Sequence, residues 1–460
     1  MPESYDVIII GAGQAGGPLA SAFARAGKRV VLAEATHVGG TCINEGCTPT
    51  KTMVASARVA YLARRAADYG VQTGTVSVDL EVVRKRKRDI VAEWSSGSEE
   101  QLRKDGVDLV FGTARFTGHK IVEIALNDGG ARAVTAETMI INAGARPSVP
   151  EIEGLDTVEY LNSTTIMELG SVPEHLVVLG GGYIALEFGQ MFRRFGSQVT
   201  IVQRGERLLG REDADVADAV AAIMREDGIA VLLGSAARKV ARSDDGGVQI
   251  SVATPDGQRT IAGSQLLVAV GRTPNSDRLD LKAGGIEVDK RGNIVVNAKL
   301  ATSVAGVYAL GDINGGAAFT HISYDDYRIL KANLLDGGDR STDGRLVPYT
   351  MYTDPQLARV GLGEDEARTA GRAIRVATMQ MSSVARAIET DETRGMIKAV
   401  IAADSDAILG FTMLGIEGGE IMSAVQLAMQ GGLPYTALRD AVFAHPTLAE
   451  ALNNLFADLK

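Results

Sequence analysis

The sequence has only two cysteines among its 460 residues, which excludes a scaffold held together by many disulfides. It has no excess of positive charge. The formal net charge of -10 argues against nucleic acid as a partner, because phosphate binding needs a basic surface. It also has no apolar run long enough to span a membrane, and acidic residues precede its first short run, Val7–Ile10. We therefore expect a cytoplasmic protein with no signal peptide and no membrane partner.

The most informative feature that is present is an internal repeat. Residues 6–34 contain an apolar run, a glycine-rich turn, an alanine-rich segment of helical character and a second apolar run, and residues 176–204 repeat this layout. The apolar runs show no polar alternation, which is typical of parallel strands buried on both faces. Two strand–turn–helix–strand units with the same spacing predict two Rossmann-like dinucleotide-binding domains.

The glycines of each turn have specific physical roles. In the pattern G-x-G-x-x-G/A the first glycine permits a tight bend, and the second lets the backbone approach a pyrophosphate. The third position allows close packing of helix on strand. The following helix N-terminus offers N–H groups and a positive dipole end to the phosphates. A turn that binds no ligand is the alternative. The turn residues are Gly11, Gly13 and Gly16 in the first repeat, and Gly180, Gly182 and Ala185 in the second.

Cys42 and Cys47 lie in a glycine-rich segment after the first repeat, at the predicted start of a helix marked by Pro49. A helix N-terminus stabilises a thiolate, so we predict low thiol pKa values and reversible disulfide formation for this pair. A metal site would need three or four ligands, and only His37 lies nearby, so none is expected. Two buried structural thiols are the other alternative, although paired cysteines in such a loop are more often redox-active.

Three motifs together resemble the class I pyridine nucleotide–disulfide oxidoreductases, the family of glutathione reductase, lipoamide dehydrogenase and mercuric reductase. They are the cysteine segment at residues 39–49, the pair at residues 311–312, and the sequence His-Pro-Thr-Leu-Ala-Glu at residues 445–450. Residues 319–328 look most like the mercuric-reductase-like branch, which includes flavoproteins of the reactive-chlorine-resistance type. The resemblance covers the whole chain. It implies that electrons pass from a nicotinamide cofactor through FAD to a redox disulfide.

The resemblance also implies roles for single residues. Cys42 would exchange with the electron acceptor, and Cys47 would contact the flavin. Tyr183 would cover the nicotinamide pocket until the cofactor enters, although it can instead merely pack there. Lys51 and Glu187 would form an ion pair near the flavin, with an ordinary buried salt bridge as the alternative.

His445 and Glu450 lie five positions apart, so the carboxylate can orient the imidazole and raise its basicity, as in a general base and its orienting group. An isolated His–Pro pair is more often structural. In the family this pair comes from the partner subunit and faces the cysteines. The resemblance therefore implies a catalytic role for both residues and an obligate homodimer.

The repeat allows a direct comparison of the two nucleotide sites. Glu34 and Gln203 occupy the same place, at the end of the second strand of each unit. Glu34 can accept both ribose hydroxyls, which suits the adenosine of FAD. Gln203 is neutral, and Arg204, Arg207 and Arg211 follow it. Because a carboxylate would repel a 2′-phosphate and arginines would bind it, NADPH is expected in preference to NADH. A solvated basic turn is the alternative.

Three later apolar runs end at Gly144, Gly271 and Gly311, and they predict the return strands of the two nucleotide-binding folds. Asp312 follows the third run, where a carboxylate suits a ribityl or ribose hydroxyl. The fold class we predict is α/β, with two Rossmann-like domains and a C-terminal α+β dimerisation domain. The expected boundaries are 1–147 for the first part of the FAD-binding domain, 148–271 for the NAD(P)-binding domain, 272–344 for the second, central part, and 345–460 for the dimerisation domain. Further expected cofactor contacts are Gly40, Thr41, Lys51, Gly144, Gly271 and Asp312.

The acceptor stays open between hypotheses of different classes. Mercuric reductases carry a cysteine pair near the C-terminus that is missing here, and glutathione reductases carry an arginine where Ser21 stands, although Arg328 matches another of their substrate arginines. Lipoamide dehydrogenases need an acidic residue for NADH at the position that Gln203 occupies here. The first hypothesis is an NADPH-dependent reductase of a small disulfide, a metal ion or an oxidised electrophile. The others are an NAD(P)H:quinone or oxygen flavin reductase with ancillary cysteines, and a redox sensor.

Glu45 lies between the two cysteines, where the family usually has an apolar residue. A carboxylate there is a like charge for a thiolate, so it should raise thiol pKa values and disfavour negative acceptors. It can also attract a cation. The alternative is a solvent-screened side chain with no electrostatic role.

Overall fold

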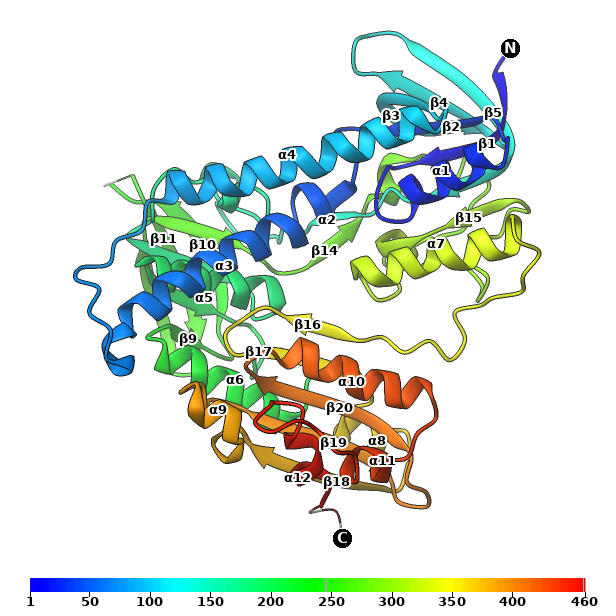
Figure 1. Cartoon of the computed structure of the whole chain (residues 1–460). Helices are drawn as coiled ribbons and strands as arrows, with labels where there is room; N and C mark the ends of the chain where they lie inside the picture. Colours follow the sequence, from blue (N-terminus) through cyan, green and yellow to red (C-terminus); the bar gives the residue numbers. More distant parts are fainter. Residues whose placement is uncertain (245, 458, 460) are drawn as a thin grey trace. The chain divides into compact units, whose positions relative to one another are not determined.

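The computed structural model describes residues 1–244, 246–457 and 459. The chain divides into two compact units, each assembled from three separate stretches of sequence (Figure 1). Unit 1 consists of Met1–Thr52, Val82–Ser148 and Gly271–Arg345. Unit 2 consists of Met53–Glu81, Val149–Val270 and Leu346–Lys460.

A six-stranded sheet forms the centre of unit 1. Strand β1 pairs in parallel with both β2 and β5, and β15 extends the parallel set beyond β5. Strand β3 pairs in parallel with β2 and then forms an antiparallel meander with β4 and β5. A separate two-stranded ribbon joins β6 and β14. The elements are β1 (Glu3–Ile10), α1 (Gly16–Arg25), β2 (Val30–Glu34), α2 (Gly40–Asn44), α3 (Cys47–Arg64, which continues into unit 2), α4 (Leu80–Lys104), β3 (Asp108–Gly118), β4 (Ile121–Leu126), β5 (Ala131–Ile141), β6 (Ala145–Pro147), β14 (Arg272–Pro274), β15 (Val307–Ala309) and α7 (Thr320–Leu334).

The apolar run of β1 is buried on both faces of this sheet. Val7 and Ile9 pack in the core cluster that also holds Leu19 of α1. Ile8 and Ile10 pack in the cluster on the other face. The lack of polar alternation in the sequence is explained by this two-sided burial.

Unit 2 contains the second repeat and a larger antiparallel sheet. A four-stranded parallel sheet has the order β13-β7-β8-β9, and a three-stranded antiparallel sheet has the order β10-β11-β12. The five-stranded sheet β16-β17-β20-β19-β18 is antiparallel, and its core includes residues of α10, α11 and α12. The elements are β7 (His175–Leu179), α5 (Tyr183–Phe195), β8 (Gln198–Val202), α6 (Ala214–Glu226), β9 (Ala230–Leu232), β10 (Ala236–Arg242), β11 (Val248–Thr254), β12 (Gly257–Gly263), β13 (Gln265–Val268), β16 (Tyr349–Met351), β17 (Gln356–Gly361), α8 (Glu364–Thr369), β18 (Ile374–Gln380), α9 (Ala385–Glu389), β19 (Met396–Ala402), β20 (Ile408–Gly415), α10 (Gly418–Gln430), α11 (Tyr435–Arg439) and α12 (Ala451–Ala457).

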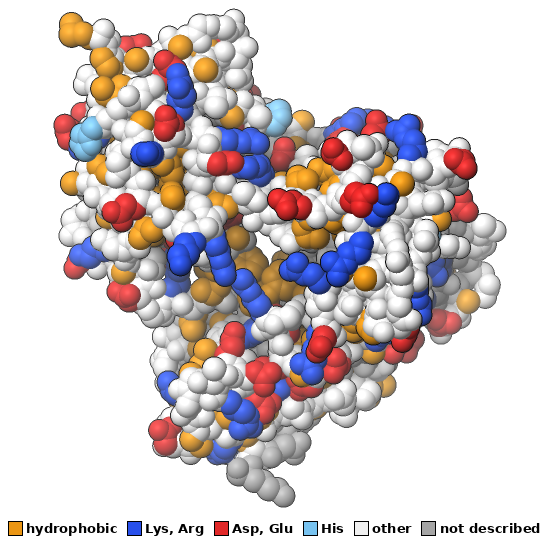
Figure 2. All heavy atoms as spheres, turned by 180° about the vertical axis from the view of Figure 1, so that it is seen from behind, with side chains coloured by type: hydrophobic (Ala, Val, Ile, Leu, Met, Phe, Trp, Pro, Cys, Tyr) orange, Lys and Arg blue, Asp and Glu red, His pale blue; other side chains and the backbone are white. Residues whose placement is uncertain are grey.

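The predicted α/β class and the internal repeat are both confirmed. The unit β1–α1–β2 reappears as β7–α5–β8, with parallel pairing of the two strands in each case. Acidic and basic side chains are interspersed on the face of the molecule that Figure 2 shows. Among the described residues, no helix has the length and apolar character needed to cross a bilayer.

Candidate active site

The first glycine of each repeat has the same geometry. Gly11 has a φ of +100°, and a Cβ there would lie 2.4 Å from the backbone oxygen of Asn142. Gly180 has a φ of +115°, and a Cβ there would lie 2.3 Å from the backbone oxygen of Ala269. In both turns the bend therefore requires glycine for two reasons, its backbone conformation and its approach to the end of a neighbouring strand.

The other turn positions leave each helix N-terminus close to its glycine turn. A Cβ at Gly16 would lie 2.0 Å from the oxygen of Gly11, whereas Ala185 is fully buried and fits in the second repeat. Gly182 is exposed, and a Cβ there would meet nothing within 4 Å. No side chain caps either α1 or α5. Backbone N–H groups at both helix starts therefore fit the phosphates of a dinucleotide.

Asn142 is a residue of this site that the sequence reasoning missed. Its side-chain oxygen accepts a hydrogen bond of 2.9 Å from the N–H of Gly16, and its amide nitrogen donates one of 2.9 Å to the oxygen of Leu310. It is 7% exposed. Asn142 thus ties the start of α1 to the ends of β5 and β15. In the sequence, Asn142 is marked only as a single polar residue at the end of the apolar run that leads to Gly144.

Glu34 lies where the sequence predicts, at the last position of β2. It is buried, and its carboxylate accepts hydrogen bonds from the N–H groups of Ala12 at 2.8 Å and Thr36 at 2.9 Å. Gly40 closes the next loop against the glycine turn, since a Cβ there would lie 2.8 Å from the Cα of Gly13. A carboxylate at the strand end and two glycine loops in close approach fit the adenosine and pyrophosphate of FAD.

The remaining predicted contacts of unit 1 follow strand ends. Asp312 comes shortly after β15, and burial raises the pKa of its carboxyl although Arg272 lies beside it, with 3.8 Å between Nε and Oδ2. Gly144 has a φ of +64° and Gly271 a φ of +139°. Thr41 is exposed on α2. These residues fit a cofactor site of unit 1, and their individual contacts stay predictions.

The two cysteines lie on consecutive helices, and both are thiols outside any disulfide. Cys42 is on the short helix α2, and Cys47 is the first residue of α3. The sulfur of Cys47 lies 3.3 Å from the hydroxyl oxygen of Thr320, the first residue of α7. Cys47 is therefore beside two helix N-termini, whose positive dipole ends favour a thiolate. Thr320 is a second residue that the sequence reasoning did not single out.

The prediction of low pKa values for both thiols is wrong for Cys42. A hydrogen bond to Cys47 and burial raise the pKa of the Cys42 thiol. The physical reason is that two neighbouring thiols in one site cannot both ionise easily, so one keeps its proton while the other is a thiolate. Cys47 is exposed and Cys42 is half-buried in this chain, so the assignment of Cys42 as the exchanging thiol stays a prediction.

Lys51 and Glu187 belong to different units, so their expected pairing stays a prediction. Lys51 is half-buried on α3, one turn after Cys47. Glu187 is buried on α5, and its carboxylate accepts a hydrogen bond of 2.8 Å from the N–H of Tyr352. Glu45 is half-buried at the end of α2.

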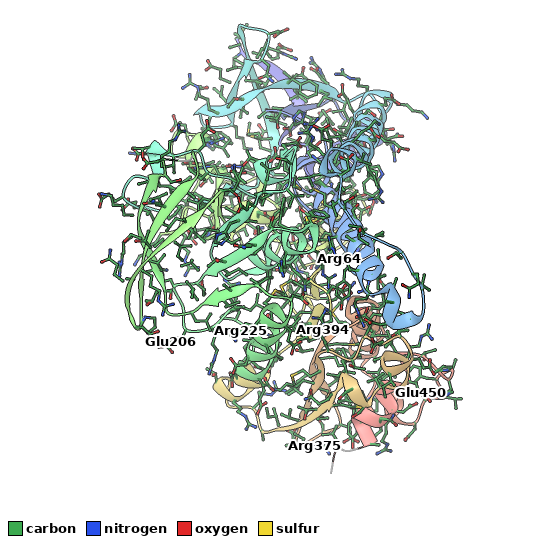
Figure 3. All side chains as sticks on the ribbon, turned by 90° about the vertical axis from the view of Figure 1, so that its left-hand side faces the viewer. Arg64, Glu206, Arg225, Arg375, Arg394 and Glu450 are labelled. Carbon is green, nitrogen blue, oxygen red and sulfur yellow. The ribbon has the colours of Figure 1, made fainter. Side chains whose placement is uncertain are left out.

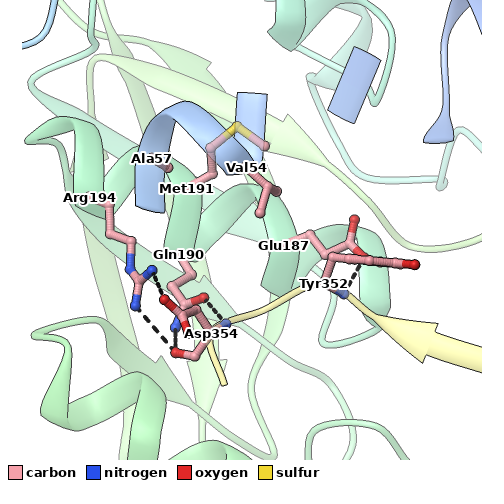
Figure 4. A pocket seen from close by; sticks show the side chains of 8 residues that line it. All are labelled: Val54, Ala57, Glu187, Gln190, Met191, Arg194, Tyr352 and Asp354. Atoms are coloured by element: carbon pink, nitrogen blue, oxygen red, sulfur yellow. Dashed lines mark hydrogen bonds and ion pairs between the residues drawn. The ribbon is translucent and has the colours of Figure 1, made fainter. Parts of the chain in front are cut away.

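A charged cluster next to Glu187 anchors the segment that follows β16 (Figure 4). Gln190 bonds both the N–H and the carbonyl of Asp354, at 2.8 Å and 2.9 Å. The Asp354 carboxylate pairs with Arg58 and Arg194. Burial alone would raise the pKa of this carboxyl, but the two arginines hold it below its usual value.

The turn after β8 contains the residues expected to bind a 2′-phosphate. Gln203 follows β8 directly, and its amide nitrogen donates a 3.1 Å hydrogen bond to the oxygen of Arg207. Arg204 and Arg207 are exposed. The carboxylate of Glu206, labelled in Figure 3, lies in the same turn, a feature the sequence reasoning did not weigh.

Tyr183 is the first residue of α5 and is half-buried. Its hydroxyl donates to Glu212 at 3.3 Å, and its ring lies 5.5 Å from that of Tyr349, centroid to centroid. Burial, with Glu212 as the next cause, raises the pKa of Tyr183 to about 12. The phenol is therefore protonated at neutral pH.

His445 and Glu450 are brought together as expected. The Nδ1 of His445 lies 2.9 Å from the carboxylate of Glu450, which Figure 3 labels near the C-terminal end of the chain. The histidine side chain is 68% exposed in the single chain. A carboxylate on Nδ1 leaves Nε2 available to exchange a proton, and this catalytic role stays a prediction.

Family models match nearly the whole chain. The pyridine nucleotide-disulphide oxidoreductase model matches residues 5–326, and the dimerisation domain of the same family matches residues 347–456. This family uses a flavin and a pyridine nucleotide.

Curated relatives and solved structures agree with these models. The probable pyridine nucleotide-disulfide oxidoreductase RclA of Escherichia coli is 37% identical over the full length of both chains. The mercuric reductase of Staphylococcus aureus is 34% identical, with 97% of this chain and 81% of that protein covered. The structure of a Cu(II) complex of the HOCl-induced flavoprotein disulfide reductase RclA has a TM-score of 0.90, 37% identity and full coverage of both chains. The chain therefore belongs to the pyridine nucleotide-disulphide oxidoreductase family and is an oxidoreductase of its RclA and mercuric reductase branch.

Proposed function

We propose that this protein is an FAD-dependent NADPH oxidoreductase that passes electrons through the Cys42–Cys47 pair to a small oxidised acceptor. The observation that carries the proposal is the redox pair itself. The two thiols share one hydrogen-bonded site, and the sulfur of Cys47 lies 3.3 Å from the hydroxyl oxygen of Thr320 at the start of α7. This arrangement favours one thiolate and one protonated thiol, which is the state that exchanges with an oxidised acceptor.

When bound, the two cofactors supply a hydride from the nicotinamide and a flavin that relays its two electrons to the cysteine disulfide. The residues of the chain supply the attacking thiol and the proton acceptor. The protonated Cys42 is the proposed attacking thiol, and it must lose its proton to react. His445 of the partner subunit is the proposed proton acceptor, oriented by its Glu450. Oxidation of the dithiol to the disulfide releases two electrons and two protons to the acceptor and the base.

Among the three acceptor classes we favour a metal ion, with Cu(II) as the first candidate, because the second cysteine pair of mercuric reductases is missing from this sequence. Relatives in the same branch include mercuric reductases and an RclA solved as a Cu(II) complex. The carboxylate of Glu45, between the cysteines and half-buried, adds a negative charge that suits a cation better than an anionic disulfide. Soft thiolates are preferred ligands of Cu(I), the product of Cu(II) reduction. Two electrons reduce two Cu(II) ions to Cu(I), or one Hg(II) ion to metallic mercury.

The preference for NADPH and the homodimer are parts of the same proposal. Gln203 is neutral at the position where Glu34 stands in the first repeat, and Arg204 and Arg207 are exposed beside it. The match to a dimerisation domain and the 68% exposure of the His445 side chain support a second chain over this histidine.

A panel assay with a matched variant tests the function. Oxidation of NADPH is followed with Cu(II), Hg(II), glutathione disulfide, small aliphatic disulfides, a quinone and oxygen, for the native enzyme and Cys42→Ser. The proposal predicts that metal or disulfide turnover is lost in Cys42→Ser while quinone reduction survives. Equal turnover of every acceptor by both proteins would instead identify a flavin reductase with ancillary cysteines.

A further inference from the structure

The peptide bond between Leu310 and Gly311 is held at both of its polar ends by buried side chains of unit 1. Its carbonyl oxygen accepts a hydrogen bond of 2.9 Å from the side-chain amide of Asn142. Its N–H donates one of 2.9 Å to Oδ2 of Asp326, on helix α7. Asn142 is 7% exposed and Asp326 is 1% exposed. Turning this peptide over would bring its carbonyl to the carboxylate and its N–H to the amide, so both hydrogen bonds would be lost.

Asp326 is itself fixed by Arg345. Oδ1 of Asp326 lies 2.7 Å from a guanidinium nitrogen of Arg345, which leaves Oδ2 for the N–H of Gly311. Burial raises the pKa of this carboxyl, although Arg345 opposes the change. The space at Gly311 is closed, because a Cβ there would lie 2.7 Å from the hydroxyl oxygen of Ser323. With a φ of +68°, Gly311 turns the chain directly before Asp312.

Asp312 follows this peptide at the carboxyl end of β15. Because β15, β5, β1 and β2 pair in parallel, their carboxyl ends form one edge of the sheet, which also carries Gly11 and Glu34. Ligands of such sheets bind at this edge. Among the described residues, no other side chain donates a hydrogen bond to the Asp312 carboxylate, and its side chain is 25% exposed. The carboxylate is therefore available to a hydroxyl of a cofactor.

We propose that Asp326 is a positioning residue for the flavin site, which fixes the Leu310–Gly311 peptide so that Asp312 presents its carboxylate to a hydroxyl of FAD. This inference rests on the proposed function, in which FAD occupies unit 1. Without the Asp326 carboxylate, the N–H of Gly311 is a buried donor that has lost its partner, and the peptide gains by turning toward another acceptor. Asp312 then turns with it, because the two residues are adjacent in the chain.

The proposal predicts that the effects of Asp326 and Asp312 on FAD binding are not additive. Asp326→Leu and Asp312→Ala should each weaken FAD binding about 10- to 100-fold, which corresponds to the loss of one charge-assisted hydrogen bond. In Asp312→Ala, the further change Asp326→Leu should weaken binding by less than about 2-fold, because the carboxylate that it positions is already absent. A merely structural Asp326 would weaken binding by the same factor in both backgrounds.

The measurement is the dissociation constant of FAD, obtained from the fluorescence of the flavin that serial dilution of the FAD-loaded enzyme releases. The proteins are the native enzyme, the two single variants and the double variant. The matched control is Asp325→Leu, at the neighbouring carboxylate, which pairs with Arg340 and Arg345. It should leave the dissociation constant within about 2-fold of the native value.

A second variant covers the case in which Asp326→Leu does not fold. Asp326→Asn matches the carboxylate in size, but its amide oxygen should turn to the guanidinium of Arg345 and leave its N–H groups facing the N–H of Gly311. FAD binding should then weaken about 3- to 10-fold when Asp312 is present and stay unchanged in Asp312→Ala.

A loss of FAD affinity that disappears in Asp312→Ala, with Asp325→Leu unchanged, supports the inference. Equal losses in both backgrounds, a loss of the same size in Asp325→Leu, or no loss at all overturn it. The flavin absorbance of the purified native enzyme separates this inference from the function on which it rests. A native enzyme that binds no FAD contradicts the proposed function, whereas a native enzyme that holds FAD, with additive or absent losses, contradicts only the role of Asp326.

Discussion

Asn142 offers the sharpest test of how the fold builds its first nucleotide site. Asn142→Leu keeps the size of the side chain but removes two hydrogen bonds, to the N–H of Gly16 and the oxygen of Leu310. Both partners are main-chain groups in the buried centre of unit 1. Each group left without a partner costs about 1–3 kcal/mol, so the variant should lose about 2–6 kcal/mol of stability.

The loss should appear in two measurements. Because Asn142 fixes the start of α1, the variant should release FAD more readily, seen as flavin in the filtrate of a concentrated sample. Its thermal midpoint should fall by about 4–24 °C, at about 2–4 °C per kcal/mol for units of this size.

A matched control separates this effect from the general cost of losing an amide. Asn127 is exposed, and its side chain makes one hydrogen bond of 3.0 Å to the oxygen of Ala35. Asn127→Leu should change stability by less than about 1 kcal/mol and leave FAD retention unaltered. The reasoning is refuted if Asn142→Leu keeps its flavin and its thermal midpoint as well as Asn127→Leu does.

Three further predictions follow from charged residues. Arg204→Ala should cost about 1.5–3 kcal/mol in kcat/KM for NADPH and little for NADH. The control is Arg225→Ala, at an exposed arginine on α6, which should change neither value. Equal losses with both cofactors would exclude the 2′-phosphate role of Arg204. Glu45→Val should lower the pH at which the reduced cysteine pair shows long-wavelength absorbance, and it should speed the turnover of anionic disulfides at low salt. An unchanged pH titration of that absorbance would leave Glu45 without an electrostatic role. Asp354→Asn should destabilise the protein by about 3–5 kcal/mol at neutral pH, because it removes the carboxylate that pairs with the buried Arg194 and leaves Arg58 with Glu392 alone. Since the folded pKa of Asp354 is lowered, its contribution is complete above about pH 4 and is lost on further acidification, so native and variant stabilities measured by circular dichroism should converge there.

The features that the sequence predicted well are those with a local pattern. Gly11 and Gly180 were recognisable because each glycine turn lies between a buried strand and a helix, and the structure places both in the same backbone conformation. The pairing of His445 with Glu450 was equally predictable from the sequence, since the two residues lie close together in the chain.

The features that were missed depend on contacts between distant segments. Asn142 is 126 residues from Gly16 and 168 from Leu310. A single sequence reports periodicity and turn chemistry but gives no distance between such segments. The raised pKa of Cys42 has a related cause: a helix start is visible in the sequence, whereas the burial of Cys42 and its hydrogen bond to Cys47 appear only in the structure.

Reductive titration of the purified, FAD-loaded enzyme tests the central claim most directly. The account predicts that the oxidised native enzyme takes up two equivalents of NADPH per chain under anaerobic conditions, one for the flavin and one for the Cys42–Cys47 disulfide. Two new thiols should appear in the denatured product. Cys42→Ser should take up one equivalent and gain no thiols. Uptake of a single equivalent by the native enzyme, with no new thiols, would contradict electron transfer through the cysteine pair.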